Sequence, residues 1–187
     1  MDQQLVVRVQ NGDERAFEAL VVADQPRLYR LAYGILRDLQ LAEDATQQAL
    51  LDIWRDARRL RNPARYEGWS YRLLVRVCYA EAKRRPPWQP AGHIPTIDET
   101  RAADAYLGVA DRDQLERGFQ QLSMDHRVVL TLRFLLGMTP EEVAATLDLP
   151  RSTVYSRLQA AVKAMRAAIE AEGRSAPVAL ERQEAVR

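Results

Sequence analysis

Arginine, aromatic and amide side chains alternate between positions 58 and 76. Arginines stand at 58, 59, 61 and 65, an Asn-Pro pair at 62–63, and aromatic rings at 66, 69 and 71. Cations that follow a phosphate backbone, beside rings on which bases stack, are typical of surfaces that bind single-stranded nucleic acid. A rigid Asn-Pro-Ala loop suits one extruded base. We predict that this stretch binds an unpaired strand.

The candidate contacts within this stretch have different alternative roles. Arg61, Asn62, Arg65 and Tyr66 favour the nucleic-acid role. Trp69 falls on the apolar stripe of the helix expected to follow, which favours a place in the core. The alternative for the arginines is a solvated helical surface.

A second pattern, from Thr139 to Leu158, predicts a helix-turn-helix. Thr139, with Glu142 three residues later, forms a capping-box sequence, and Pro140 suits the first helical position. Asp148 stands in the turn, where it tolerates a left-handed backbone, and Leu149 is expected in the core. The next helix can enter a DNA major groove, with early residues on base edges and later basic residues on phosphates. An ordinary αα-hairpin of a bundle is the alternative.

Helices must position both patterns, because strand signals are nearly absent and apolar residues recur at spacings of three and four. Helices are expected at about 13–22, from Pro26 onward, and at about 41–60, 66–85, 112–121, 124–136, 140–147 and 151–172. Prolines and glycines between 86 and 110 predict a linker. We expect an all-α fold of two small helical domains, 1–85 and 112–172, joined by a Pro-rich flexible linker at 86–111 and followed by a polar tail at 173–187.

Charge is distributed unevenly. The 187 residues have a net charge of +1, but residues 27–88 carry 13 basic and 7 acidic side chains, a net charge of +6. This segment favours a polyanion partner. No apolar run is long enough to cross a bilayer, and the N-terminus lacks the features of a secretory signal. We therefore expect a cytoplasmic protein without membrane insertion.

The residue types that usually carry out catalysis or bind metals are sparse. Cys78 is the one cysteine, beside two histidines, so no metal-ligand set is expected. We find no nucleophile–base pair and no glycine-rich phosphate loop. We predict no cofactor, no metal and no catalytic residue, hence not an enzyme, and expect Cys78 to be a small buried apolar residue.

Three blocks, in their order, resemble a bacterial RNA polymerase sigma factor of the compact extracytoplasmic-function (ECF, group 4) type. The segment 42–54, AEDATQQALLDIW, is similar to that family's core-binding helix. The segment 69–76, WSYRLLVR, is similar to the helix that reads and melts the −10 promoter element. The segment 122–166 is similar to the region that reads the −35 element, with residues 152–158 on its recognition helix. The two domains would then be sigma regions 2 and 4.

The resemblance implies a division of labour and three partners: core RNA polymerase, through the clamp region of its largest subunit, promoter DNA, and an anti-sigma factor. Core polymerase would contact Asp44, Gln47, Gln48 and Asp52. The −10 element would contact Arg61, Asn62, Arg65, Tyr66, Trp69, Arg72 and Arg76. The −35 element would contact Arg151, Ser152, Thr153, Tyr155, Ser156, Arg157, Lys163 and Arg166.

Some positions depart from the family pattern. Gln48 stands where Glu is usual, Tyr155 where a basic residue is common, and Ser152 where Gly is frequent. Because the second domain has nearly neutral charge, we expect the free protein to bind promoter duplex poorly until polymerase tethers both modules.

The implied function is to direct core polymerase to specific promoters and to promote their opening. The alternatives are a non-initiating helix-turn-helix regulator and a sigma-like decoy that binds anti-sigma factors. The block at 61–76 argues against both, because neither needs a surface for a melted strand.

Overall fold

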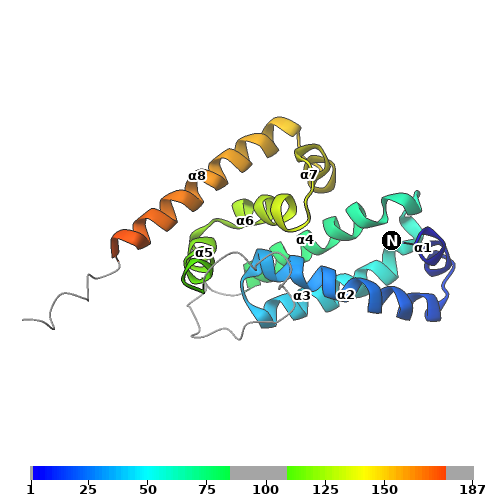
Figure 1. Ribbon diagram of the computed structural model, residues 1–187. Coiled ribbons are helices and arrows are strands. Elements are labelled where there is room, and N and C mark those ends of the chain that lie inside the picture. The colour runs from blue at the N-terminus through cyan, green and yellow to red at the C-terminus, as the bar shows by residue number, and fades with distance from the viewer. Residues whose placement is uncertain (1, 85–108, 176–187) are drawn as a thin grey trace, which may run out of the picture.

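The computed structural model describes residues 2–84 and 109–175, and every regular element in these ranges is helical (Figure 1). The first module comprises α1 (Gln3–Gln10), α2 (Glu14–Leu36), α3 (Leu39–Asp56), the short turns η1 (Ala57–Arg59) and η2 (Pro63–Arg65), and α4 (Tyr66–Arg84). The second comprises α5 (Val109–Gln121), α6 (Met124–Leu130), the π-helical turn η3 (Thr131–Leu135), α7 (Pro140–Leu147) and α8 (Arg151–Ser175). The all-α fold is confirmed. The predicted linker lies, up to residue 108, outside the described residues, as does the tail beyond 175.

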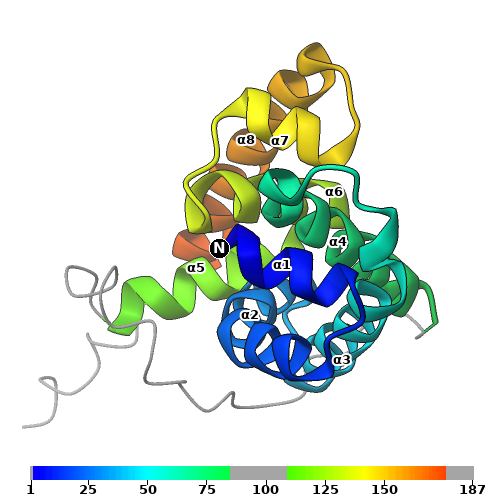
Figure 2. The same cartoon turned by 90° about the vertical axis from the view of Figure 1, so that its right-hand side faces the viewer.

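The core of the first module lies between α2, α3 and α4, which pack along one another (Figure 2). Their apolar residues recur every three or four positions, so each helix presents one stripe to the others. Fully buried members of this core include Leu28, Leu31, Ile35, Ile53 and Leu74. Burial of such a side chain contributes roughly 1.5–3 kcal/mol, which explains why packing dominates over local preference here.

The predicted break before Pro26 is wrong, because α2 runs without interruption from Glu14 to Leu36. Proline removes one backbone hydrogen bond and costs about 3 kcal/mol in a helix interior. The carbonyl that loses its partner belongs to Val22, whose side chain is exposed. Water can therefore hydrate the Val22 carbonyl, while the stripe of buried residues on the opposite side of the helix continues past Pro26.

Helix α1 is absent from the elements predicted from the sequence. Its start is fixed by Asp2, whose carboxylate accepts the amide hydrogen of Gln4 at 2.9 Å. Val6 and Val9, three residues apart, bury one face of this two-turn helix. A helix this short is marginal alone, so its packing against α2 and the two short turns holds it in place.

The two modules pack against each other: α2 contacts α6 and η3, and α4 contacts α7 (Figures 1 and 2). The modules approach closely at Gly34 of α2, where an added Cβ would lie 2.5 Å from Cγ2 of Thr131. Polar contacts join the same surfaces, including Arg37 Nε to Glu116 Oε1 at 3.0 Å and Arg127 to the carbonyl of Leu36 at 3.3 Å.

Candidate functional site

The predicted strand-binding residues lie on the loop that connects η1 to α4. We call residues 61–65 the capture loop. Arg61, Asn62 and Arg65 are exposed on it. Asn62 orders the loop itself, because its Oδ1 accepts the amide hydrogen of Ala64 at 3.0 Å and starts η2. The arrangement is a compact, polar, cationic turn, as the Asn-Pro sequence predicts.

Tyr66 differs from the other predicted strand contacts. Its side chain is only 2% exposed, and its hydroxyl donates to Oδ2 of Asp24 at 2.7 Å. The reason is its place at the start of α4, on the same stripe as the buried Ser70 and Leu74. In this structure the ring offers no face to a base, and the prediction that it lies on the strand-binding surface is corrected.

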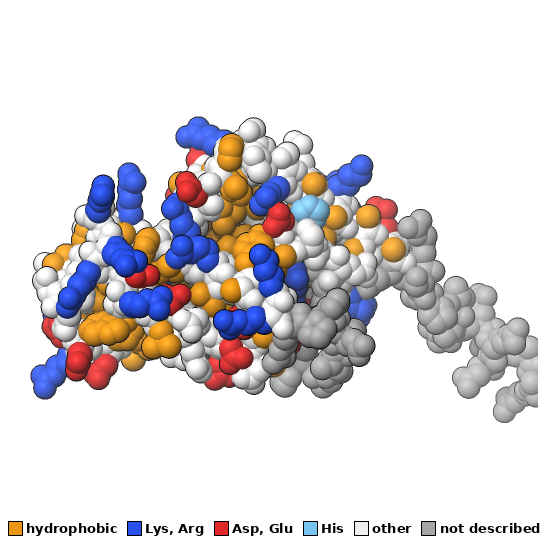
Figure 3. Space-filling view, turned by 180° about the vertical axis from the view of Figure 1, so that it is seen from behind, with side chains coloured by type: hydrophobic (Ala, Val, Ile, Leu, Met, Phe, Trp, Pro, Cys, Tyr) orange, Lys and Arg blue, Asp and Glu red, His pale blue; other side chains and the backbone are white. Residues whose placement is uncertain are grey.

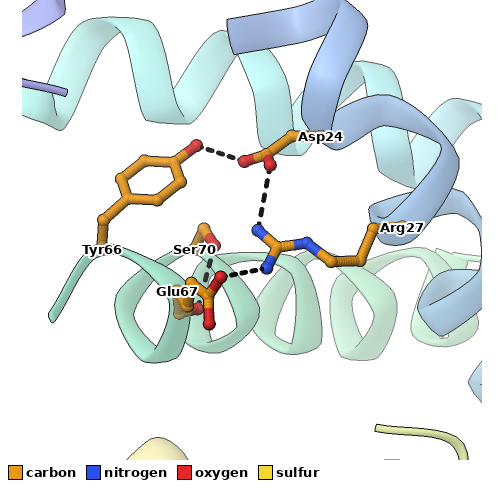
Figure 4. Close-up of polar contacts among 5 residues, drawn as sticks. All are labelled: Asp24, Arg27, Tyr66, Glu67 and Ser70. Carbon is orange, nitrogen blue, oxygen red and sulfur yellow. Dashed lines mark hydrogen bonds and ion pairs between the residues drawn. The ribbon is translucent and has the colours of Figure 1, made fainter. Parts of the chain in front are cut away.

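A buried polar cluster lies behind the capture loop (Figure 4). Asp24 of α2 is 1% exposed and accepts hydrogen bonds from Tyr66 and from Arg27 Nη2 at 3.0 Å. Arg27 Nη1 also reaches Glu67 Oε1 of α4 at 2.9 Å, while Ser70 Oγ donates to the carbonyl of Glu67. Burial raises the pKa of Asp24, against the opposing effects of the Tyr66 hydroxyl and Arg27. Burial and the neighbouring carboxylate raise the pKa of Tyr66.

Asp24 and Arg27 were not among the residues predicted from the sequence. A signal was available, because Asp24 stands exactly where an apolar residue would continue the stripe formed by Leu20, Leu28 and Leu31. A carboxylate on the buried face of a helix requires a partner, since burial of an unpaired charge is costly.

The remaining predicted −10 contacts lie on α4 and face different surroundings. Trp69 is half-buried, with its ring centroid 6.1 Å from that of Tyr66. Arg72 donates through Nε to the carbonyl of Thr146 at 2.8 Å and through Nη2 to the carbonyl of Ala145. These carbonyls end α7, so Arg72 caps a helix of the second module. Arg76 is exposed.

The predicted polymerase-binding face is a continuous polar surface on α3. Asp44, Gln47 and Gln48 are exposed, and Asp52 is half-buried. Gln48 Nε2 donates to Asp52 Oδ1 at 2.9 Å, one helical turn away. Leu51 stands in the same stretch with 60% of its surface exposed. An exposed leucine beside amides and carboxylates is a suitable centre for a protein contact.

The helix-turn-helix has the local structure that its sequence predicts. Thr139 and Glu142 form both bonds of the capping box, at 3.2 and 2.7 Å. Asp148 adopts the left-handed conformation with φ 57°, and Leu149 packs against the core. Helix α8 then begins at Arg151 with its first turns facing outward.

Four of the predicted −35 contacts near the start of α8 are exposed: Arg151, Ser152, Tyr155 and Ser156. Tyr155 is held by a hydrogen bond from its hydroxyl to Glu141 Oε1 of α7 at 3.1 Å. Thr153, another predicted −35 contact, is half-buried.

Arg157 was expected to face outward with Arg151 but lies on another face of α8. It is half-buried and pairs with Asp125 Oδ2 of α6 at 3.1 Å. Six positions along a helix with 3.6 residues per turn place the two arginines on different faces. Asp125 also accepts the hydroxyl of Tyr79 from α4 at 2.5 Å, so the carboxylate that pairs with Arg157 inside the second module also contacts the first.

Lys163 and Arg166 are exposed on α8. They line a groove of about 390 Å³ together with Phe134, whose side chain is 68% exposed. The space-filling view from behind shows that many Lys and Arg side chains project from the first module as well (Figure 3). Basic side chains are therefore present on both modules, as a long polyanion would require.

Residues 2–84 and 109–175 contain no helix long and apolar enough to cross a membrane. Within the same ranges no group of three His, Cys, Asp or Glu side chains is placed to hold a metal ion. Cys78 is fully buried, as predicted, and burial raises the pKa of its thiol to about 12.

A helical module with an exposed cationic loop, joined to a module that ends in a capped helix-turn-helix, defines a two-module protein of the DNA-binding class. Comparison with known proteins specifies the class. The sigma-70 region 2 family model matches residues 20–86, and the sigma-70 region 4 model matches residues 112–165.

Two relatives and one solved structure illustrate the similarity. The RNA polymerase sigma-H factor of Pseudomonas aeruginosa is 31% identical over 90% of this chain and 94% of that protein. The ECF RNA polymerase sigma-E factor of Escherichia coli K12 is 32% identical over 84% of this chain and 88% of that protein. The sigma factor RpoE of Bartonella quintana, solved with the anti-sigma factor NepR, is 18% identical, with a TM-score of 0.66 over 82% of this chain and 96% of that one.

The chain therefore belongs to the ECF group of the sigma-70 family. It is an RNA polymerase sigma factor that directs transcription from specific promoters.

Proposed function

We propose that the protein carries out this role through three separate surfaces. The polar face of α3 docks on core polymerase, the capture loop holds the unpaired −10 strand, and the first turns of α8 read the −35 element in the major groove. Binding alone performs the task, without covalent chemistry. The observation that carries the proposal is the capture loop, because Arg61 and Arg65 flank an ordered Asn-Pro turn on an exposed surface.

Promoter opening follows from this arrangement. Extrusion of a base from the duplex costs a few kcal/mol. Hydrogen bonds from charged groups such as Arg61 and Arg65 contribute roughly 1.5–3 kcal/mol each. A loop that is already ordered captures a transiently exposed base without first losing its own conformational freedom. The cationic loop thus biases the promoter toward the open form once polymerase has brought it to the −10 element.

The contact between the modules bears on when DNA can bind. Arg72 caps α7 and Arg157 pairs with Asp125, so two of the predicted DNA contacts are engaged within the protein. These bonds must break before either guanidinium can meet a phosphate or a base. This supports the expectation that the free protein binds promoter duplex poorly and that polymerase carries both modules to their sites.

The partners and setting belong to the same proposal. An anti-sigma factor would bind between the two modules and cover both DNA-reading surfaces; support comes from the likeness in fold to a sigma factor solved with such a partner. We place the protein in the cytoplasm, where polymerase and DNA are found, and assign it no enzymatic activity.

Transcription with purified core enzyme on a promoter library tests the proposal. The protein should produce specific run-off transcripts, which a non-initiating regulator or a decoy would not. On a selected promoter, Asn62→Ala should reduce opening by about tenfold, equivalent to about 1.4 kcal/mol, while closed-complex binding changes little. Gln25→Ala, an exposed change on α2, is the control. Equal losses in closed binding and opening would contradict strand capture.

A second measurement tests the polymerase face. Asp44→Lys reverses an exposed charge on α3 and should weaken association with core enzyme, without altering the unfolding midpoint. Glu18→Lys, an exposed reversal on α2, controls for net charge. Undiminished association of the Asp44 variant would remove α3 from the docking surface.

A further inference from the structure

The capture loop is anchored in the protein at both ends. The residue before it, Leu60, and the residue after it, Tyr66, are both buried, whereas the arginines between them are exposed. The position of the exposed residues is therefore set by whatever holds these two ends.

Gln10, the last residue of α1, holds the first end. Its Nε2 donates to the carbonyl of Leu60 at 2.5 Å and to the carbonyl of Ala57 at 3.1 Å. The two carbonyls flank η1, and that of Ala57 also accepts the amide hydrogen of Leu60 at 3.1 Å. One side-chain amide thus joins α1 to the backbone immediately before Arg61, across 50 positions of sequence.

The buried polar cluster holds the second end. The hydroxyl of Tyr66 donates to Asp24, which is fixed in turn by Arg27. Arg27 continues to Glu67, the second residue of α4, and its guanidinium lies 4.8 Å from the ring centroid of Tyr71. The start of α4 is therefore bonded to α2 through two successive residues (Figure 4). Asp24 and Tyr66 are buried at this anchor.

We propose that Gln10 and the Asp24–Tyr66 pair are positioning residues that keep the capture loop in its strand-binding conformation. The inference rests on the proposed function of that loop. The three side chains act through the backbone of the loop and not through contact with DNA. Loss of either anchor lets the loop sample other conformations, and capture of a base then carries the entropy of ordering it.

Two conservative substitutions remove the anchors with little change in shape. Tyr66→Phe deletes the hydroxyl, and Gln10→Met deletes the amide donor but keeps an unbranched side chain. Matched controls are Tyr29→Phe and Gln25→Met, both on α2 and neither part of the capture loop or of its two anchors. All proteins are assayed well below their unfolding midpoints, with the folded fraction checked by circular dichroism.

The first readout is amide hydrogen exchange in the free, full-length protein. The amides of Ala64 and Arg65 are bonded to Asn62 within the loop. Exchange at these two amides should be at least tenfold faster in both anchor variants, while exchange in the centres of α2 and α3 stays unchanged. Unchanged exchange at the loop would overturn the positioning role.

The second readout is promoter opening with core enzyme, followed by 2-aminopurine fluorescence in the −10 element of a promoter selected from the library. Each anchor variant should reduce opening by about tenfold, with association with core enzyme unchanged. In an Asn62→Ala background the same substitutions should have little further effect, because the loop already captures poorly. Additive losses in that background, or parallel losses in core association, would overturn the proposal.

The two readouts separate two failures. If the anchor variants show faster exchange at the loop but the wild type opens no promoter, the positioning role stands and the proposed function is overturned. Normal opening by both anchor variants with faster loop exchange would overturn the positioning role alone.

Discussion

The two modules present their DNA-facing residues by different means. In the second module these residues lie on the first turns of a helix, and the turn before it is set by a capping box and one left-handed residue, all within twelve positions. In the first module they lie on a loop whose shape depends on side chains from α1 and α2, tens of residues away. Neighbouring residues thus determine the orientation of the helix, whereas tertiary contacts determine the conformation of the loop.

We expect the largest effect from a substitution that breaks the buried polar cluster of the first module. Arg27→Met leaves the carboxylate of Asp24 buried without its ion-pair partner, which should lower the free energy of unfolding by about 3 kcal/mol. Urea denaturation followed by circular dichroism measures the change. Arg30→Met, an exposed substitution on the same helix, should alter stability by less than about 0.5 kcal/mol. Similar values for both would mean that the cluster is not what stabilises this module.

The same chemical change made in each module should have different consequences. Tyr66→Phe removes a hydroxyl bonded to a buried carboxylate and should cost about 1.5 kcal/mol in unfolding free energy. Tyr155→Phe removes a hydroxyl bonded to Glu141 on the exposed surface of α8, and its unfolding midpoint should match that of the wild type. Thermal melts of the two variants side by side provide the comparison. A larger loss from Tyr155→Phe would reverse the contrast between the modules.

The turn of the helix-turn-helix offers a strictly local test. Asp148 has a positive φ, which a β-branched residue tolerates poorly. Asp148→Val should therefore lower the unfolding free energy by about 1 kcal/mol, whereas Asp148→Gly should be nearly neutral because glycine adopts this backbone readily. Chemical denaturation checks both. A penalty shared by valine and glycine would point to a role of the carboxylate itself.

The smallest expected effect is a pH dependence specific to the first module. Because burial raises the pKa of Asp24 above the unfolded value of 3.8, its contribution to stability is fully present below that pH and is lost as pH rises through the folded pKa. Asp24→Asn abolishes this titration. The stability of the wild type relative to the variant should thus decline from about pH 4 upward, as measured by urea unfolding at several pH values. A relative gain over this range would mean that Arg27 and Tyr66 outweigh burial.

The contrast between local and tertiary determinants also explains which features the sequence could predict. The all-α fold, the capping box, the conformation of Asp148 and the exposure of Arg61, Asn62 and Arg65 depend on neighbours within a few residues, so residue types and spacing suffice. The buried position of Tyr66 was also implied by its spacing on α4, but its place among the aromatic residues suggested a surface role instead.

The rest depends on pairs that no local pattern reveals. Tyr66 bonds to Asp24, which is 42 positions away, and Gln10 bonds to Leu60, the residue before the capture loop, which is 50 positions away. Helix α1 is stabilised by packing on distant elements. Helix α2 continues through Pro26 because it has buried residues on both sides of that position. Arg72 and Arg157 were expected on DNA surfaces, but Arg72 bonds to α7 of the other module and Arg157 pairs with Asp125 inside its own module.

A substitution at Gly34 offers a way to separate the two modules. Because the methyl group of an alanine there would lie 2.5 Å from Thr131 Cγ2, the two surfaces could not meet as they do. Gly34→Ala would act as a wedge that adds no charge and touches neither Arg72 nor Arg157. A chain wedged apart in this way would leave the guanidinium group of Arg72 available before any partner arrives, whereas Arg157 would keep its ion pair with Asp125 inside the second module. Alanine also favours a helix more than glycine does.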